Sequence, residues 1–243
     1  MDEPYYRPDL ARVHHEGFDF HAEAVAPGIL RLLEPVRAAG GLVLEFGCGS
    51  GLLTRYLVAA GHRVLATDAS PAMLELARET VPGAEGFEVL ALPRDAVPRA
   101  DAIVGVGHPI NYLPSLDAIH EALRAMAAAL RPGGVLAFDI CDLAYGALRR
   151  DDGSRGWVRD DWALVTRFSV PAPDRFVRDM AIFMRNPDGT WRRDDERHDN
   201  VLVDVTTIPP LLAAHGIEAS VGTAFGDETM PRGLHTVVGR KAG

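Results

Sequence analysis

Glu45, a glycine-rich turn and Asp68 could together hold a small ligand. Glu45 lies two residues before the turn GCGSG (47–51), and Asp68 comes about 20 residues after the turn begins. A dinucleotide site has a third glycine in the pattern G-x-G-x-x-G, and Leu52 occupies that position here. A phosphate-binding P-loop needs Gly-Lys-Ser or Gly-Lys-Thr, which this turn lacks.

The charges of these residues narrow the choice of ligand. Glu45 would repel a pyrophosphate and attract a cation, and an acidic residue at the position of Asp68 usually binds ribose hydroxyls. The ligand should therefore carry a ribose and a positive charge but no phosphate, and S-adenosylmethionine meets all three conditions. A bare tight turn beside a capped strand end explains the joint presence of these residues less well.

His108 is the first candidate for acid–base chemistry. It follows the continuously apolar segment 100–107, at the edge of the sheet where α/β folds bind ligands. An imidazole titrates near neutral pH, so His108 could take a proton from an acceptor, or it could only cap the loop before Pro109. Asn111 and Tyr112, in the same loop, are candidate substrate contacts, and Tyr112 could equally be an apolar wall.

Glu196 and His198 are two residues apart in a predicted strand, so their side chains project from the same face. If that face points inward, they form a polar floor with a possible catalytic role. Because most neighbouring residues are charged, the same face could also be solvated. Both interpretations remain open at this point.

The segment HHEGFDFH (14–21) contains residue types that bind metals. Its spacing differs from H-E-x-x-H, so we expect a helix that faces solvent or the lid, and no metal. His14 is a candidate contact for cofactor or substrate. Cys48 has no adjacent base in the sequence and is expected to be a small filler in the turn.

Strand-like and helix-like segments alternate around these residues. The expected strands are 42–46, 62–68, 87–92, 100–107 and 135–140, followed near the end by 217–225 and 234–241. The expected helices are 13–38, broken at Pro27 and Pro35, and 52–61, 70–81, 116–130 and 207–216. This alternation predicts an α/β fold, doubly wound around a mostly parallel, seven-stranded, Rossmann-like sheet.

From Trp157 onward the pattern changes to two-residue alternation, with NPDG (186–189) as a turn. This pattern is typical of antiparallel strands. We therefore expect a single domain over residues 1–243, with an antiparallel β lid inserted at about 157–203.

The composition limits the possible partners. The chain has 243 residues and a formal net charge of −9, without a Lys/Arg-rich run, which disfavours nucleic acid and anionic membranes. Neither a signal peptide nor an apolar run of transmembrane length is visible, and the two cysteines lack metal-like spacing. We expect a cytoplasmic protein with a small-molecule substrate, as a monomer or a homodimer.

The stretches LEFGCGSG, ATDASPAML and LRPGGVLAFDI resemble motifs of class I S-adenosylmethionine-dependent methyltransferases, over about residues 22–140. The resemblance implies that Glu45 and the turn hold the methionine end, that Asp68 binds the ribose, and that residues 69, 73 and 90–92 flank the adenine. The stretch VLALP lacks the aspartate that often accepts from the adenine amine, so backbone groups would serve there. The expected cofactor contacts are Glu45, Gly47, Cys48, Gly49, Gly51, Asp68, Ala69, Met73, Ala91 and Leu92.

Residues 12–33, the stretch VGHPINYL and the strand with Glu196 and His198 are similar to bacterial small-molecule methyltransferases, including N-methyltransferases of nucleotide-linked aminosugars. This similarity implies methyl transfer to an O or N atom of a natural-product or sugar-type acceptor, in secondary metabolism. Three alternatives stay open: a C-methyltransferase, a methyltransferase-like cyclase, and a protein that only senses the cofactor.

Overall fold

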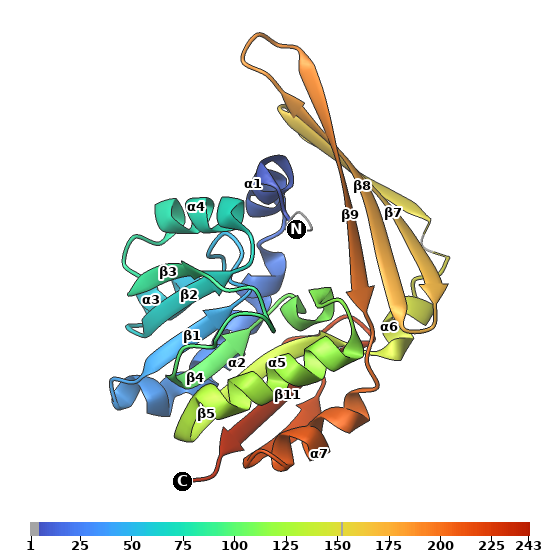
Figure 1. Ribbon diagram of the computed structural model, residues 1–243. Coiled ribbons are helices and arrows are strands. Elements are labelled where there is room, and N and C mark those ends of the chain that lie inside the picture. Colours follow the sequence, from blue (N-terminus) through green and yellow to red (C-terminus); the bar gives the residue numbers. More distant parts are fainter. Residues whose placement is uncertain (1–4, 152) are drawn as a thin grey trace.

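The computed structural model describes residues 5–151 and 153–243 and contains two β-sheets (Figure 1). The larger sheet has seven strands in the order β10-β11-β5-β4-β1-β2-β3, and only β11 runs antiparallel to its neighbours. Its strands are β1 (Leu42–Phe46), β2 (Arg63–Asp68), β3 (Gly86–Val89), β4 (Ala100–Gly105), β5 (Leu130–Cys141), β10 (Ile217–Gly222) and β11 (Leu234–Lys241). The strand order reverses between β1 and β4, which is where such sheets bind ligands.

Helices cover both faces of this sheet. The described helices are α1 (Pro8–Gly17), α2 (Phe20–Ala38), α3 (Thr54–Ala59), α4 (Pro71–Thr80), α5 (Leu116–Ala129), α6 (Leu143–Ala147) and α7 (Ile208–Ala213), with short 3-10 turns at Pro109–Tyr112 and Val205–Thr207. Of these, α1 and α6 contact the second sheet. Val43 packs in one core with residues of α2 and α3, and its neighbour Leu44 packs in the other with residues of α5 and α7. This alternation along β1 explains why the buried strands are apolar on both faces. The predicted fold class is confirmed.

The N-terminal helical region differs from expectation. The predicted breaks at Pro27 and Pro35 are wrong, because α2 runs through both prolines and the chain instead breaks between Gly17 and Phe20. Each proline removes one backbone donor from the helix. The buried side chains of α2, which include Ile29 and Leu33, hold the helix against the sheet despite this loss.

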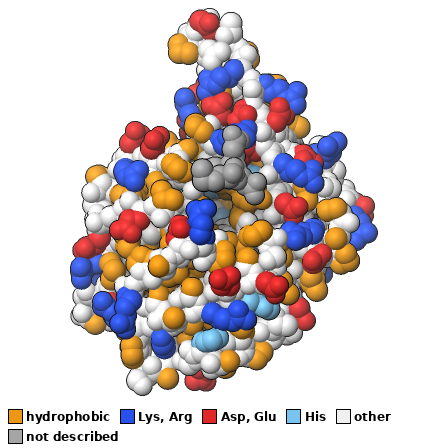
Figure 2. Space-filling view, in the orientation of Figure 1, with side chains coloured by type: hydrophobic (Ala, Val, Ile, Leu, Met, Phe, Trp, Pro, Cys, Tyr) orange, Lys and Arg blue, Asp and Glu red, His pale blue; other side chains and the backbone are white. Residues whose placement is uncertain are grey.

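The second sheet, called the lid sheet, consists of β6 (Ser154–Val158), β7 (Trp162–Ala172), β8 (Arg175–Arg185) and β9 (Trp191–Val201). It is antiparallel throughout and projects beyond the larger sheet as a long twisted ribbon (Figure 1). Basic and acidic side chains are interspersed over its projecting part (Figure 2). Toward the projecting end, where it pairs with Met184 of β8, Trp162 packs against α1 and donates from Nε1 to Glu16 at 2.8 Å.

Among the described residues, no helix is long and apolar enough to cross a membrane.

Candidate active site

A cavity of about 580 Å³ opens at the carboxyl ends of β1, β2 and β4. All of the expected cofactor contacts except Gly51 line this cavity. Those that line it are Glu45, Gly47, Cys48, Gly49, Asp68, Ala69, Met73, Ala91 and Leu92. The structure therefore brings nearly all of these residues together, although their contacts with a cofactor stay a prediction.

The glycine turn has a conformation that other residues would strain. Gly47 has a φ of 63°, and a Cβ atom there would meet Cβ of Pro109 at 2.4 Å. The turn therefore approaches the loop after β4 at a distance that only glycine allows. Gly51 lies outside the wall, where a Cβ would meet Val81 at 3.0 Å, so its absence of a side chain serves packing against the end of α4.

Asp68 ties the turn to the start of α4. Its two oxygens accept from Gly49 N and Ser70 N, each at 2.8 Å. Burial raises the pKa of Asp68, and these backbone donors act in the opposite direction. Each oxygen retains a second lone pair that can accept from a ligand hydroxyl.

Glu45 is a buried acid, 1% exposed, beneath the glycine turn. Burial raises its pKa to about 8, and the hydrogen bond from Thr54 Oγ1 at 2.7 Å lowers the pKa only in part. Among the described residues, no cationic side chain pairs with Glu45. A buried carboxyl without a cation fits a ligand that brings a positive charge, so this end of the cavity suits the amino group of S-adenosylmethionine.

The segment around Ala91 forms the far wall of the cavity. The backbone N–H of Ala91 already donates to Asp95 Oδ2 at 2.8 Å. Asp95 therefore fixes the strand end where the aspartate of related enzymes is missing, and this N–H has no free hydrogen for an adenine.

His108 follows β4 in the left-handed conformation, with a φ of 51°. Its ring stacks on Tyr112 at a centroid distance of 5.6 Å, and its Nδ1 is buried without a partner among the described residues. Burial, followed by the charge of Arg178, lowers the pKa of His108 to about 3. A base of this strength accepts a proton poorly near neutral pH, and His108 does not line the cavity. The catalytic role of His108 stays a prediction, and both its low pKa and its position outside the cavity wall argue against it.

Asn111 does not face the cavity, which disagrees with its expected role as a substrate contact. It is fully buried, donates from Nδ2 to the carbonyls of Cys141 and Val201, and accepts from Cys141 N. These bonds tie the loop after β4 to β5 and β9. The amide of Asn111 is therefore occupied by backbone groups at the ends of these two strands.

Glu196 and His198 point inward, so the interpretation as a solvated face is wrong. His198 is fully buried and its Nε2 lies 2.9 Å from Glu196 Oε2. Burial, followed by the charge of Arg178, lowers the pKa of His198 to about 2, so this imidazole is neutral. Neither residue lines the cavity, and their catalytic role stays a prediction.

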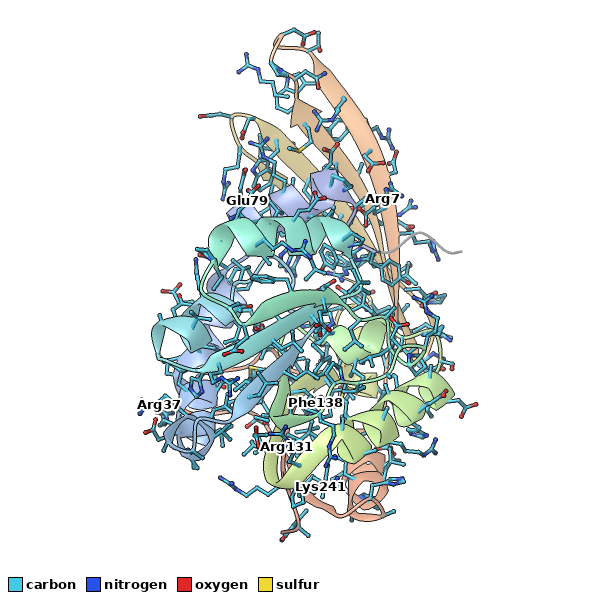
Figure 3. The ribbon with its side chains drawn as sticks, turned by 60° about the vertical axis from the view of Figure 1, so that its left-hand side comes forward. Arg7, Arg37, Glu79, Arg131, Phe138 and Lys241 are labelled. Carbon is cyan, nitrogen blue, oxygen red and sulfur yellow. The ribbon has the colours of Figure 1, made fainter. Side chains whose placement is uncertain are left out.

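The N-terminal segment Tyr5–Arg7 lies between the cavity and this pair. The backbone N–H groups of Tyr6 and Arg7 donate to the Glu196 carboxylate at 2.9 and 2.7 Å. The Tyr5 and Tyr6 rings pack on His198 with centroids 4.6 and 4.8 Å away. Arg7 lies where this segment meets the lid sheet (Figure 3). The lid sheet itself contributes no described residue to the cavity wall, so it acts on the cavity through wall residues that it contacts, among them Tyr5 and Tyr6.

Tyr112 links the loop after β4 to the N-terminal segment and to the lid sheet. Its hydroxyl contacts Tyr6 Oη at 2.9 Å and accepts from Arg178 Nη2 of β8. Arg178 also reaches Nδ1 of His198 at 3.4 Å. Tyr112 and His14, both expected near substrate, line the cavity, and burial lowers the pKa of His14 to about 4.

Five residues of the site escaped sequence analysis as functional residues: Tyr5, Tyr6, His21, Asp139 and Arg178. The tyrosines and Arg178 lack a motif, since only the packing of distant segments brings them together. Asp139 lies inside the stretch VLAFDI, where an acidic residue interrupts an otherwise buried strand, and that signal could have been used. Among the described residues, no group of three His, Cys, Asp or Glu side chains is placed to hold a metal.

Residues 43–134 match a family model described as a methyltransferase domain. The fold is similar to an S-adenosylmethionine-dependent methyltransferase from Clostridium acetobutylicum, with a TM-score of 0.79, 17% identity, and coverage of 96% of this chain and 98% of the other. It is also similar to the sugar N-methyltransferase KedS8 from a Streptoalloteichus species, with a TM-score of 0.76, 20% identity, and coverage of 100% and 97%. The CcbJ methyltransferase from Streptomyces caelestis gives a TM-score of 0.74, 18% identity, and full coverage of both chains. None of the curated proteins compared with this sequence matches it.

The family model and the fold together confirm the predicted class. The chain carries a methyltransferase domain of the S-adenosylmethionine-dependent class, and it is an enzyme with S-adenosylmethionine as cofactor. At identities of 20% or less, the similar structures establish the fold and leave the acceptor open.

Proposed function

We propose that this enzyme transfers the methyl group to an O or N atom of a small acceptor of the sugar or natural-product type. The observation that supports this most is the set of phenol rings around the cavity. Tyr5, Tyr6 and Tyr112 all line it, and the hydroxyls of Tyr6 and Tyr112 lie 2.9 Å apart. Phenol hydroxyls can donate to or accept from an alcohol or an amine, which would orient its lone pair.

The size and cover of the cavity favour a discrete molecule. Methyl transfer from a sulfonium is an in-line displacement, so the acceptor must fit between the cofactor and the tyrosines. The Tyr5–Arg7 segment is fixed over this space through Glu196. Two proteins with a similar fold, KedS8 and CalS10, are a sugar N-methyltransferase and an amino pentose methyltransferase, and acceptors of this type are in keeping with the proposal.

Alignment would supply most of the rate in this proposal. The imidazoles of His108 and His198 have lowered pKa values of about 3 and about 2, so neither is suited to remove a proton. An amine acceptor that loses its proton to solvent needs only positioning. Aromatic rings also stabilise the positive charge that forms on a methylated nitrogen.

We also propose that the lid sheet belongs to a single domain with the rest of the chain. Val201 and Val203, at the end of β9, pack in the same core as α5 and α7. A cytoplasmic location and a role in secondary metabolism belong to the same proposal.

The test uses S-adenosylmethionine with a deuterated methyl group and two acceptor panels, one of nucleotide-linked aminosugars and one of their hydroxyl analogues. Mass spectrometry should find the labelled methyl group on nitrogen or oxygen, and Tyr112→Phe should lower kcat/KM more than it weakens S-adenosylhomocysteine binding. A label found on carbon would contradict the proposal. Tight cofactor binding with no transfer to either panel or to a metabolite extract would favour a sensor.

A further inference from the structure

A buried carboxylate joins α2 to the loop after β4. Asp139 of β5 is fully buried and accepts three hydrogen bonds, from His21 Nε2 at 2.6 Å, Gly107 N at 3.0 Å and His108 N at 2.5 Å. His21 is the second residue of α2, and its side chain remains 21% exposed. The cavity wall includes both His21 and Gly107, so one carboxylate positions two parts of the wall.

The two nitrogens of His21 differ. Nε2 contacts Asp139, whereas Nδ1 has no hydrogen-bond partner among the described residues. Unlike Nδ1 of His14 and of His108, Nδ1 of His21 is not sealed inside the protein. A hydrogen-bonding atom in the cavity wall is therefore available to a ligand.

His21 lies at one end of the cavity, where the amino acid end of the cofactor is expected. Asp19, two residues before His21, pairs at 3.4 Å with Arg55, whose backbone N–H donates to Gly51 of the glycine turn. Gly107, held by the same Asp139, follows the strand that pairs with β1. These contacts place His21 at the glycine-turn end of the cavity.

Among the described residues that line the cavity, the basic side chains are those of His14, His21 and Arg94. His14 is neutral because burial lowers its pKa to about 4. Arg94 follows Leu92 at the adenine end and pairs with Asp95 at 3.3 Å. For His21, burial is the largest effect and opposes protonation, but the hydrogen bond and charge of Asp139 outweigh it and raise the pKa.

The amino acid end of S-adenosylmethionine has an ammonium and a carboxylate on the same carbon atom. If Glu45 receives the ammonium, the carboxylate must lie within a few ångströms of it, where a cation is required. We propose that His21, oriented by Asp139, binds this carboxylate, with Nε2–H donated to Asp139 and Nδ1–H donated to the cofactor. This role depends on the cofactor alone and is independent of the acceptor proposed above.

Calorimetric titration with two ligands tests the role. S-adenosylhomocysteine has the amino acid end, whereas 5′-methylthioadenosine keeps the adenine, ribose and thioether but lacks that end. His21→Ala should weaken S-adenosylhomocysteine by about 10–100-fold and leave 5′-methylthioadenosine within about twofold. His235→Ala is the matched control, since His235 also pairs with an aspartate, Asp142 at 2.8 Å, but does not line the cavity, and it should change neither affinity by more than about twofold.

His21→Gln covers the possibility that the alanine variant does not fold, because the amide can still donate to Asp139 without a charge. It should show the same selective loss, with a smaller magnitude. Equal weakening of both ligands, or unchanged binding of S-adenosylhomocysteine, would overturn the proposal. Unchanged binding combined with a pH-dependent fall in kcat would assign His21 to proton transfer from the acceptor instead.

Discussion

The site has two halves that are built in different ways. The cofactor half consists of Glu45, the glycine turn, Asp68 and the strand end near Ala91, and its parts are close in sequence: Gly49 and Asp68, which share a hydrogen bond, are 19 residues apart. The half that we propose to hold the acceptor, called the acceptor half, consists of Tyr5, Tyr6, Tyr112, Glu196 and His198, and Tyr6 and Glu196 are 190 residues apart. Residues that are close in sequence form a recognisable motif, whereas residues brought together from distant segments do not.

The two halves also differ in their charges. In the cofactor half, burial raises the pKa of Glu45 to about 8, so this group holds a proton at neutral pH. In the acceptor half and beside it, burial lowers the pKa values of His14, His108 and His198, so these groups stay neutral. Acid should therefore act on the two halves in opposite directions. Four experiments test how the two halves differ.

The largest expected effect is a loss of stability in acid that originates in the acceptor half. The unfolded chain protonates His198 near pH 6.5, whereas the folded chain does so only near pH 2. Above about pH 6.5 both states are neutral, and below it the unfolded state binds the extra proton. The free energy of unfolding should then fall by up to about 1.4 kcal/mol per pH unit for each such histidine.

Urea denaturation at pH 7.5, 6 and 5 measures this loss. His198→Gln keeps hydrogen-bonding groups but cannot titrate, so its unfolding free energy should fall less steeply with pH than that of the wild type. The contribution of Glu45 to the unfolding free energy has the opposite sign, since it increases as the pH falls from about 8 to 4.5. Both proteins contain Glu45, so this contribution cancels in the comparison. Parallel pH profiles for the two proteins would show that His198 is not held neutral.

The second largest effect is expected in the cofactor half. Asp68→Ala removes the acceptor for the ribose hydroxyls and for Gly49 N and Ser70 N. A hydrogen bond to a charged group contributes about 1.5–3 kcal/mol, so S-adenosylhomocysteine affinity should fall at least about tenfold in calorimetric titration. Glu88→Ala, on the exposed face of the adjacent β3, is the control and should change little. Unaltered binding in a folded Asp68→Ala protein would break the assignment of this half.

The third effect concerns the proton on Glu45. The ionised carboxylate attracts the cofactor ammonium, and in the free protein the carboxylate forms only as pH rises toward about 8. Each pH unit between about 6 and 8 should therefore contribute up to about tenfold to cofactor affinity. The Glu45→Gln variant should lack this contribution, while the titration of His21 persists in both proteins. Equal slopes in wild type and variant would mean that Glu45 does not receive the ammonium.

The smallest effect is expected for His108. Removal of a general base typically lowers the rate by about 10²–10⁴-fold, and a group with a pKa near 3 is too weak for that role. His108→Asn should therefore keep kcat within about tenfold of wild type across the pH range. A larger fall that depends on pH would restore His108 as the base and would place proton transfer in the acceptor half.

Sequence patterns predicted the sheet because each strand carries its own apolar run. Motifs also pointed to most of the residues that line the cofactor half, while their contacts with a cofactor stay a prediction. The antiparallel strands were also expected, at 157–203, and they occupy Ser154–Val201. The acceptor half was less accessible. Whether Glu196 faces inward depends on how Tyr6 and Arg7 reach it across the molecule, and spacing within β9 does not contain that information.

The same limit applies to single residues. Asn111 has the chemistry of a substrate contact, but the ends of β5 and β9 present backbone groups that Asn111 satisfies. His108 has the position of a base, but burial beside Arg178 removes its basicity. In both cases, groups from distant segments decide the role.

The hydrogen bonds from the Tyr6 and Arg7 backbone to Glu196 have a consequence for synthesis on the ribosome. The tyrosines are made first, but their carboxylate partner is made 190 residues later. At about 5–20 residues per second, this interval lasts roughly 10–40 s. During it, the sheet from β1 to β5 can form while the tyrosines have no Glu196 to bind. A nascent chain should therefore be able to hold cofactor before it can enclose an acceptor.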